Sequence, residues 1–355
     1  MSSNESIKPS RCSWRLCPSQ PTVTVIALAF AAVAALLGFP LLGRTVYSPH
    51  LYWGMAFAAN VPGEGSDPSV LILSDRLVNT TAAMAAGGGL AVAGLMLQTL
   101  FRNPLASPFT LGIAGGASFG ASLWICIVSS FVPALASSGI SGGFGICLGA
   151  FLGAVLAMFT VYALGRNGGV SSERILLSGI AVNFFFSGLI LFVQYLSEQG
   201  RSFRMLRWTM GEIDLADPVL LWPLVLLVAA GGILLFLFSR EMDILLTGEE
   251  RAMSLGMNLS RFRLFLFFLS SLLVAAVVSI CGPIGFVGLM APHFARLLVG
   301  GGHRRLIPAS LLFGAVFLAA CFTAARTILF PNLLPVGVIT SLLGGPFFLW
   351  LLLRR

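Results

Sequence analysis

Residues 103–165 contain no Asp, Glu, Lys or Arg, which leaves 63 consecutive residues without a charged side chain. A soluble domain of that length keeps charged residues on its surface. The rest of the chain follows the same pattern, because 57% of its 355 residues are hydrophobic and only 10% are charged. These features exclude a water-soluble fold and predict an all-α integral membrane protein.

The uncharged runs give a count of membrane crossings, since one span needs about 20 apolar residues. The stretch 103–165 holds two spans, joined by a Gly/Ser/Pro-rich turn at 133–143. The stretch 264–295 holds one full helix and a shorter one, separated by Gly282-Pro283. Six further spans are expected at 23–43, 77–101, 175–197, 219–239, 306–325 and 336–353. The sequence therefore predicts about ten transmembrane helices.

The orientation of these spans follows from the positions of the arginines, because cytoplasmic loops carry the Lys/Arg excess. Ten spans place both termini on one side. That side collects a net charge of +9, whereas the opposite side has −1, which together give the overall +8. We therefore expect cytoplasmic termini and a multi-pass protein, and the basic charge reflects topology instead of nucleic-acid binding.

No residue pattern indicates catalysis on this chain. Lys8 is the only lysine, and the phosphate-binding loop of ATPases requires a Gly-Lys-Ser/Thr ending that is absent around it. Any ATP hydrolysis must therefore be done by another chain. The three histidines and six cysteines are too scattered to predict a metal centre or a disulfide framework. We predict a transport subunit with no catalytic residue, no metal site and no cofactor of its own.

Several motifs interrupt the apolar pattern and together resemble one protein family. They are GLMLQTLFRNPLASPFTLGIAGGASFGA at 94–121, LLSGIAVN at 176–183, GEERAMSLGMN at 248–258, PIGFVGLMAPHFARLLVGGGHRR at 283–305 and LPVGVITSLLGGPFF at 334–348. From about residue 25 to 355 the chain resembles the FecCD-type permeases of binding-protein-dependent ABC importers, which carry iron-siderophores, haem and vitamin B12.

The resemblance implies a bundle like the vitamin B12 importer permease, the type II importer fold. It implies a cytoplasmic tail at 1–22, a ten-helix permease domain at 23–355 and a location in the bacterial inner membrane, surrounded by lipid. The implied partners are a second, identical permease subunit, two cytoplasmic ATPases that bind ATP and Mg, and a periplasmic binding protein. An iron-siderophore is the favoured cargo, with haem or vitamin B12 as alternatives.

The coupling loop, residues 240–263, is the predicted contact with the ATPase. Its apolar and charged residues alternate at helical spacing before Gly256, which predicts a short, exposed amphipathic helical pair. An ATPase that closes on ATP must push on such a stiff element. The resemblance places the contact at Glu249, Glu250, Arg251, Ser254, Leu255 and Gly256.

Arg76 and Arg326 match the rim arginines with which the family docks its binding protein. Two departures stand beside them, because Leu73 replaces the first arginine of the family pattern and Phe322 replaces an aspartate four residues before Arg326. The alternative is that both arginines only extend from helix ends toward the membrane surface. The resemblance also places a cytoplasmic gate at Ser171 and Ser172.

Arg201, Arg204 and Arg207 recur every three residues and predict one charged face of a short helix. In the family this segment lies beside the periplasmic mouth, where arginines would attract an anionic chelate. The alternative is a loop in which Glu212, Asp214 and Asp217 balance the arginines.

A different class of protein, an ion-coupled secondary transporter, also fits a ten-span bundle. Such transporters usually bury carboxylates near the middle of the membrane. All 13 acidic residues fall in expected loops, tails or helix ends, which favours the ATP-driven alternative.

Overall fold

The computed structural model describes residues 21–43, 48, 68–128, 143–166, 172–214, 218–329 and 333–353. Most of these residues are helical, and none of them lies in a strand. Seven of their helices are long and apolar enough to cross a membrane: α1 (Pro21–Gly38), α3 (Pro68–Leu100), α7 (Gly143–Arg166), α8 (Ser172–Leu196), α10 (Leu221–Leu237), α13 (Leu259–Cys281) and α15 (His303–Thr327). Three shorter apolar helices accompany them: α4 (Ile113–Leu123), α14 (Val287–Val299) and α16 (Val336–Leu353). Together they match the ten predicted segments.

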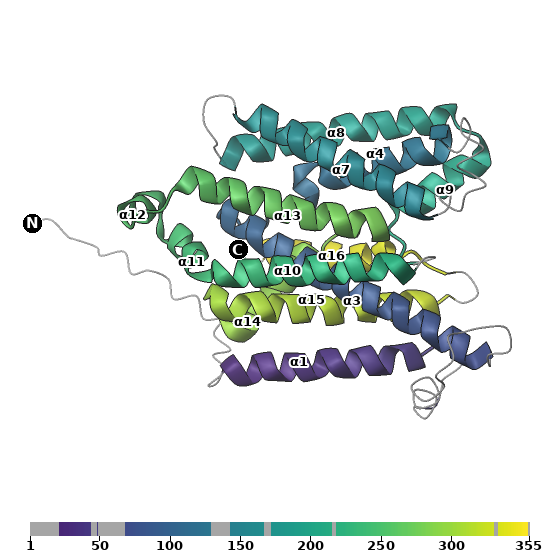
Figure 1. The fold of residues 1–355 in the computed structure, drawn as a ribbon, viewed down its shortest axis with the longest axis horizontal. Helices are drawn as coiled ribbons and strands as arrows, with labels where there is room; N and C mark the ends of the chain where they lie inside the picture. The colour runs from purple at the N-terminus through teal and green to yellow at the C-terminus, as the bar shows by residue number, and fades with distance from the viewer. Residues whose placement is uncertain are drawn as a thin grey trace, which may run out of the picture.

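The remaining helices lie at the two ends of the bundle (Figure 1). They are α9 (Gln199–Thr209) at one end and α11 (Ser239–Thr247) and α12 (Glu249–Ser254) at the other. Single turns extend or precede the longer helices: η1 (Phe39–Leu41), η2 (Pro108–Leu111), the π turn η3 (Trp124–Val128) and η4 (Pro218–Leu220). We call the two ends of the bundle the α9 end and the α12 end, after the helices that lie there.

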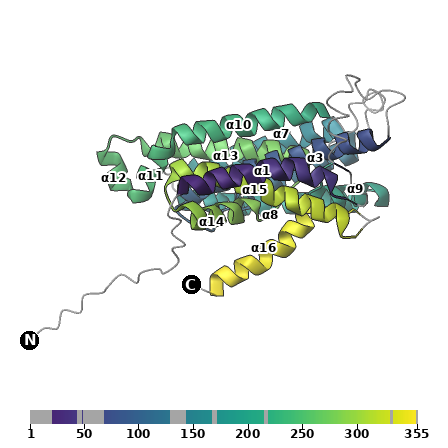
Figure 2. The ribbon, with the colours of Figure 1, turned by 90° about the horizontal axis from the view of Figure 1, so that it is seen from below.

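Helix α3 forms the centre of the bundle. About 83% of the residues in its apolar membrane-spanning stretch are buried. The corresponding share for α8 is 22%, so α8 lies at the periphery. Helices α15, α13, α14 and α10 pack around α3. Figure 1 shows α4, α7 and α8 grouped on one side of this core and α1 on the opposite side. Helix α16 leans away from the bundle (Figure 2).

Glycines allow the central helices to approach closely. A Cβ added at Gly94 would lie 1.8 Å from the carbonyl oxygen of Gly288, and one at Gly87 would lie 2.2 Å from that of Gly314. The same arrangement joins α4 to α7, where a Cβ at Gly120 would lie 2.1 Å from the Gly149 oxygen. Backbone-to-backbone contact of this kind is typical of membrane helices, which gain little hydrophobic energy from associating in lipid.

The predicted break after α13 is confirmed. Helix α13 ends at Cys281, and Gly282 adopts a φ of +66° that favours glycine. Pro283 follows and cannot donate a helical hydrogen bond. Phe286 then precedes α14 with a φ of +65°, which is unusual for a bulky residue.

The start of α3 differs from the sequence prediction. We expected this span to begin at residue 77, because charged residues were taken as boundaries, but the helix begins at Pro68 and includes Asp75 and Arg76. Asp75 has partners within and beyond its own helix: it accepts a hydrogen bond from the Asn79 amide at 3.0 Å and pairs with Arg326 of α15 at 3.7 Å. A paired charge near a helix end is tolerated inside the helix.

The two ends of the described chain agree with an even number of crossings. Helix α1 begins at the α12 end, and α16 also ends toward it (Figures 1 and 2). The predicted tail, 1–22, lies almost wholly outside the described residues, which begin at Pro21.

Candidate functional site

The coupling loop forms the predicted helical pair. Helix α11 ends at Thr247 and is followed by Gly248, whose φ is +126°, and α12 is followed by Gly256 at +82°. Ala252 is buried beneath α12, whereas Met253 is 56% exposed and Leu255 is 67% exposed. The six predicted contact residues therefore lie together on one exposed element, which also presents two large apolar side chains.

Glu249 has a different role from its neighbour Glu250. Its carboxylate pairs with Arg263 at the start of α13 and, at 3.6 Å, with Arg102 in the turn after α3. These pairs hold α12 against the bundle. Glu250 is exposed and forms no ion pair among the described residues. A hollow of 530 Å³ lies between the turn after α3 and the junction of α11 with α12. Its lining residues are Arg102, Thr247, Gly248, Glu249, Glu250 and Arg251.

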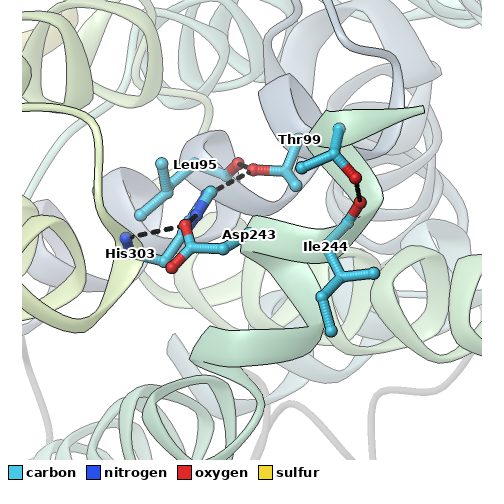
Figure 3. A network of polar contacts seen from close by, with 6 residues as sticks. Leu95, Thr99, Asp243, Ile244 and His303 are labelled. Carbon is cyan, nitrogen blue, oxygen red and sulfur yellow. Dashed lines mark hydrogen bonds and ion pairs between the residues drawn. The ribbon is translucent and has the colours of Figure 1, made fainter. Parts of the chain in front are cut away.

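A polar network centred on the buried His303 joins the coupling loop to the membrane helices (Figure 3). His303, the first residue of α15, is 1% exposed. Its Nδ1 lies 2.6 Å from Asp243 Oδ1 on α11, and its Nε2 lies 2.9 Å from Thr99 Oγ1 on α3. The backbone N–H of His303 also donates to Asp243 Oδ1 at 3.1 Å.

Sequence reasoning missed this network. It counted His303 only among three histidines too scattered to form a metal centre, in a basic turn where Arg304 and Arg305 follow it. The imidazole instead points into the bundle, where its partners lie 60 and 204 residues away along the chain. No local pattern predicts partners at such separations.

The residue before Thr99 links α3 to a further helix. Gln98 is buried, and its Oε1 accepts a hydrogen bond from Arg296 of α14 at 3.2 Å. Its amide nitrogen lies 3.5 Å from the carbonyl oxygen of Leu289, also on α14. The last turn of α3 therefore has polar contacts with α14 and α15, and through His303 it is connected to α11.

Arg76 and Arg326 lie together at the opposite end. Both line a pocket of 210 Å³ between η1, α3 and α15. Arg326 pairs with Asp75 and lies 4.7 Å from the centre of the Phe322 ring. The carboxylate that the family resemblance expected at position 322 is thus supplied from α3 instead. Arg76 donates to the Pro40 carbonyl at 3.4 Å.

The three arginines of α9 do not have equal surroundings. Arg201 pairs with Glu198 at 3.8 Å and donates to the Cys126 carbonyl, and Arg207 pairs with Glu212. Arg204 is exposed, with no ion pair among the described residues. The predicted helical face is present, but two of its charges have acidic partners.

Two of the remaining predicted residues are described and two are not. Ser171 and Asp217 lie outside the described residues. Ser172 is the first residue of α8, which places its backbone at the α12 end. Asp214 is exposed after α9.

A concavity of 830 Å³ lies between η2, the end of α9, the break before α14 and α16. Its lining combines apolar side chains such as Phe109, Met210 and Phe286 with the hydroxyls of Ser107, Thr110, Thr209 and Ser341. None of the described residues that line it is charged.

A many-helix membrane bundle with a broken helix, an uncharged concavity and an exposed helical pair at one end defines the class of membrane transport subunits. The chain belongs to the FecCD transport family, whose model matches residues 31–354. It is a permease subunit of the metal-chelate, haem and vitamin B12 type of ABC importer, in which separate chains hydrolyse ATP. This membership decides against the ion-coupled alternative.

The similarity to individual proteins extends over most of the chain. The hemin transport system permease protein of Yersinia pestis is 38% identical over 80% of this chain and 83% of its own. The cobalamin import system permease protein of Halobacterium salinarum is 36% identical over 95% and 85%. Among solved structures, one assigned as a metal-chelate type ABC transporter in an inward-facing conformation has a TM-score of 0.79 and 26% identity, and it covers 95% of this chain and 100% of its own.

Proposed function

We propose that this permease carries a ferric siderophore across the bacterial inner membrane, paired with a second copy of itself. The observation that carries the proposal is the 830 Å³ concavity with its uncharged lining. Iron that is already wrapped in an organic chelator needs no protein ligands, and a wall of apolar and hydroxyl groups lets a large chelate pass without binding it tightly. A bare cation would need carboxylate or imidazole ligands along its path.

The α12 end faces the cytoplasm in this proposal. The loops at that end carry most of the arginines, as the preference for positive charge on the cytoplasmic side requires. The termini and the gate at Ser171 and Ser172 then lie on the same side. Two ATPases, which bind ATP and Mg, contact the coupling loop through its exposed residues.

The α9 end then faces the periplasmic binding protein, with Arg76 and Arg326 as the docking residues. Changing each to glutamine should lower the association rate of the binding protein about tenfold at low salt, because rim charges steer encounter. The effect should shrink above about 0.3 M salt, since exposed charges are then screened. Stopped-flow binding to permease in nanodiscs measures these rates.

The control for docking is Arg174→Gln, which removes the same charge from the first turn of α8 at the α12 end. It should leave the association rate unchanged. Equal rates for wild type and both rim variants would assign Arg76 and Arg326 to a purely structural role.

Uptake into liposomes tests the cargo. The complete complex should accumulate ferric siderophores in preference to haem and cobalamin.

Arg204→Gln should slow uptake of an anionic chelate such as ferric citrate about twofold to fivefold, because Arg204 is the exposed arginine without an acidic partner among the described residues of α9. Uptake of a neutral hydroxamate siderophore should change much less.

The matched variant is Arg207→Gln, which removes the same charge from the same helix but also breaks the pair with Glu212. If the chelate meets the guanidinium that has no acidic partner, Arg204→Gln has the larger ligand-dependent effect, because Arg207 is already paired with Glu212. Equal slowing of every chelate by Arg204→Gln would contradict attraction of the anion. Uptake of haem or cobalamin alone would overturn the siderophore assignment.

A further inference from the structure

The His303 network lies where the coupling loop meets the membrane helices. Helix α11 has only nine residues and contains Asp243. Phe238 separates it from α10, and Gly248, with a φ of +126°, separates it from α12. A force applied to α12 would therefore be absorbed at these two junctions unless α11 is held to the bundle by side chains. His303 is a buried side chain that provides such a connection.

The hydrogen inventory of the network fixes the orientation of the imidazole. A carboxylate only accepts hydrogen bonds, so Nδ1 of His303 carries the proton that Asp243 receives. In the neutral ring, Nε2 is then an acceptor, and Thr99 shares its single hydroxyl proton between Nε2 and the Leu95 carbonyl oxygen, each 2.9 Å away. Asp243 also accepts the backbone N–H of His303, which has no acceptor within its own helix. One carboxylate on α11 thus holds both the side chain and the first turn of α15.

We propose that His303 is the positioning residue that makes α11 move together with α15 and α3. This inference rests on the proposed function, because it takes the coupling loop as the surface on which the ATPase acts. A displacement of His303 moves Thr99 on α3, to which it is hydrogen-bonded. The neighbouring Gln98 accepts a hydrogen bond from Arg296, so α14 is displaced as well. Helix α14 begins beside Phe286, which lines the concavity. Displacement of α11 thereby reaches the wall of the transport path.

Loss of the imidazole should leave the fold intact. The Asp243 side chain is 47% exposed, so water can replace the histidine as its donor. The Thr99 hydroxyl lies 2.9 Å from the Leu95 carbonyl oxygen and can donate there instead. Neither partner is left buried without a hydrogen bond, and a leucine fills a similar volume. The expected defect is therefore in coupling and not in folding.

The test measures chelate transported per ATP hydrolysed by the complete complex in liposomes, with ferric citrate, haem and cobalamin supplied in turn. His303→Leu should lower this ratio at least about fivefold, with basal ATP hydrolysis and the amount of assembled complex unchanged. Thr99→Val removes only the link to α3 and should lower the ratio less. The matched control is Thr81→Val on the same helix, whose hydroxyl bonds only the Leu77 carbonyl of its own helix.

Two conservative variants separate the links. His303→Asn places an amide near the position of Nδ1 and keeps the contact with Asp243, so it should behave like Thr99→Val. His303→Gln reaches the position of Nε2 but loses Asp243, so it should behave like His303→Leu.

The possible outcomes decide the question. A wild-type ratio in His303→Leu would overturn the inference, and so would a loss of assembled complex in proportion to activity, which would indicate a purely structural role. Equal ratios for His303→Asn and His303→Leu would also contradict it. The retained contact with Asp243 on α11 would then make no difference to coupling. A wild-type complex that binds no ATPase, or that transports none of the three chelates, would instead refute the proposed function and the inference with it.

Discussion

Leu255→Asp should reduce the amount of ATPase that copurifies with the permease about tenfold or more. Leu255 is 67% exposed at the tip of the coupling loop, beside Met253, so the pair offers an apolar anchor to a partner. A carboxylate at this position would have to be buried in the interface without a counter-charge. Copurification from detergent, followed by ATP hydrolysis of the isolated complex, measures the loss.

The fold of the permease should not change, because the Leu255 side chain is not part of the buried core. The control is Leu329→Asp, which alters a 53% exposed leucine after α15, at the α9 end. It should retain the ATPase. Glu249→Ala provides a contrast, since it breaks the pairs with Arg263 and Arg102 and should weaken assembly by loosening α12. Full ATPase binding by Leu255→Asp would move the contact away from the coupling loop.

Gly94→Ala should destabilise the bundle by about 3 kcal/mol. The new Cβ would lie 1.8 Å from the Gly288 carbonyl oxygen, and a backbone oxygen cannot move aside by changing rotamer. Helices α3 and α14 would have to separate, which would disturb the packing around the centre of the molecule. The fraction of monodisperse protein left after heating, followed by size-exclusion chromatography, reports the change.

The control for this prediction is Gly188→Ala in α8, where an added Cβ meets nothing within 4 Å. It should be neutral or slightly stabilising, because alanine favours helix more than glycine. Gly314→Ala should resemble Gly94→Ala, since its Cβ would lie 2.5 Å from the Gly87 oxygen. Equal heat stability of Gly94→Ala and wild type would mean that these two helices are not held at backbone contact.

Much of the fold follows from sequence because exclusion of charge from lipid acts on each segment separately. The uncharged runs predicted the ten apolar helices, and Gly282-Pro283 predicted the break between α13 and α14. The helical pair of the coupling loop was predicted by its alternating pattern and by Gly256. The predicted boundary at residue 77 was wrong, because we treated every charged residue as the end of a span. Asp75 lies inside α3, where it is paired with Arg326.

The sequence by itself determined the class of fold, the number of apolar segments and the family, because hydrophobicity and contiguous motifs are local properties of the chain. Only the tertiary structure decided which glycines meet, that Asp75 stands beside Arg326, and that His303 joins α11 to α3 and α15. These contacts link residues up to 251 positions apart, as between Asp75 and Arg326. A side chain's partners at such separations are set by how whole helices pack, and no local pattern of residues encodes that arrangement.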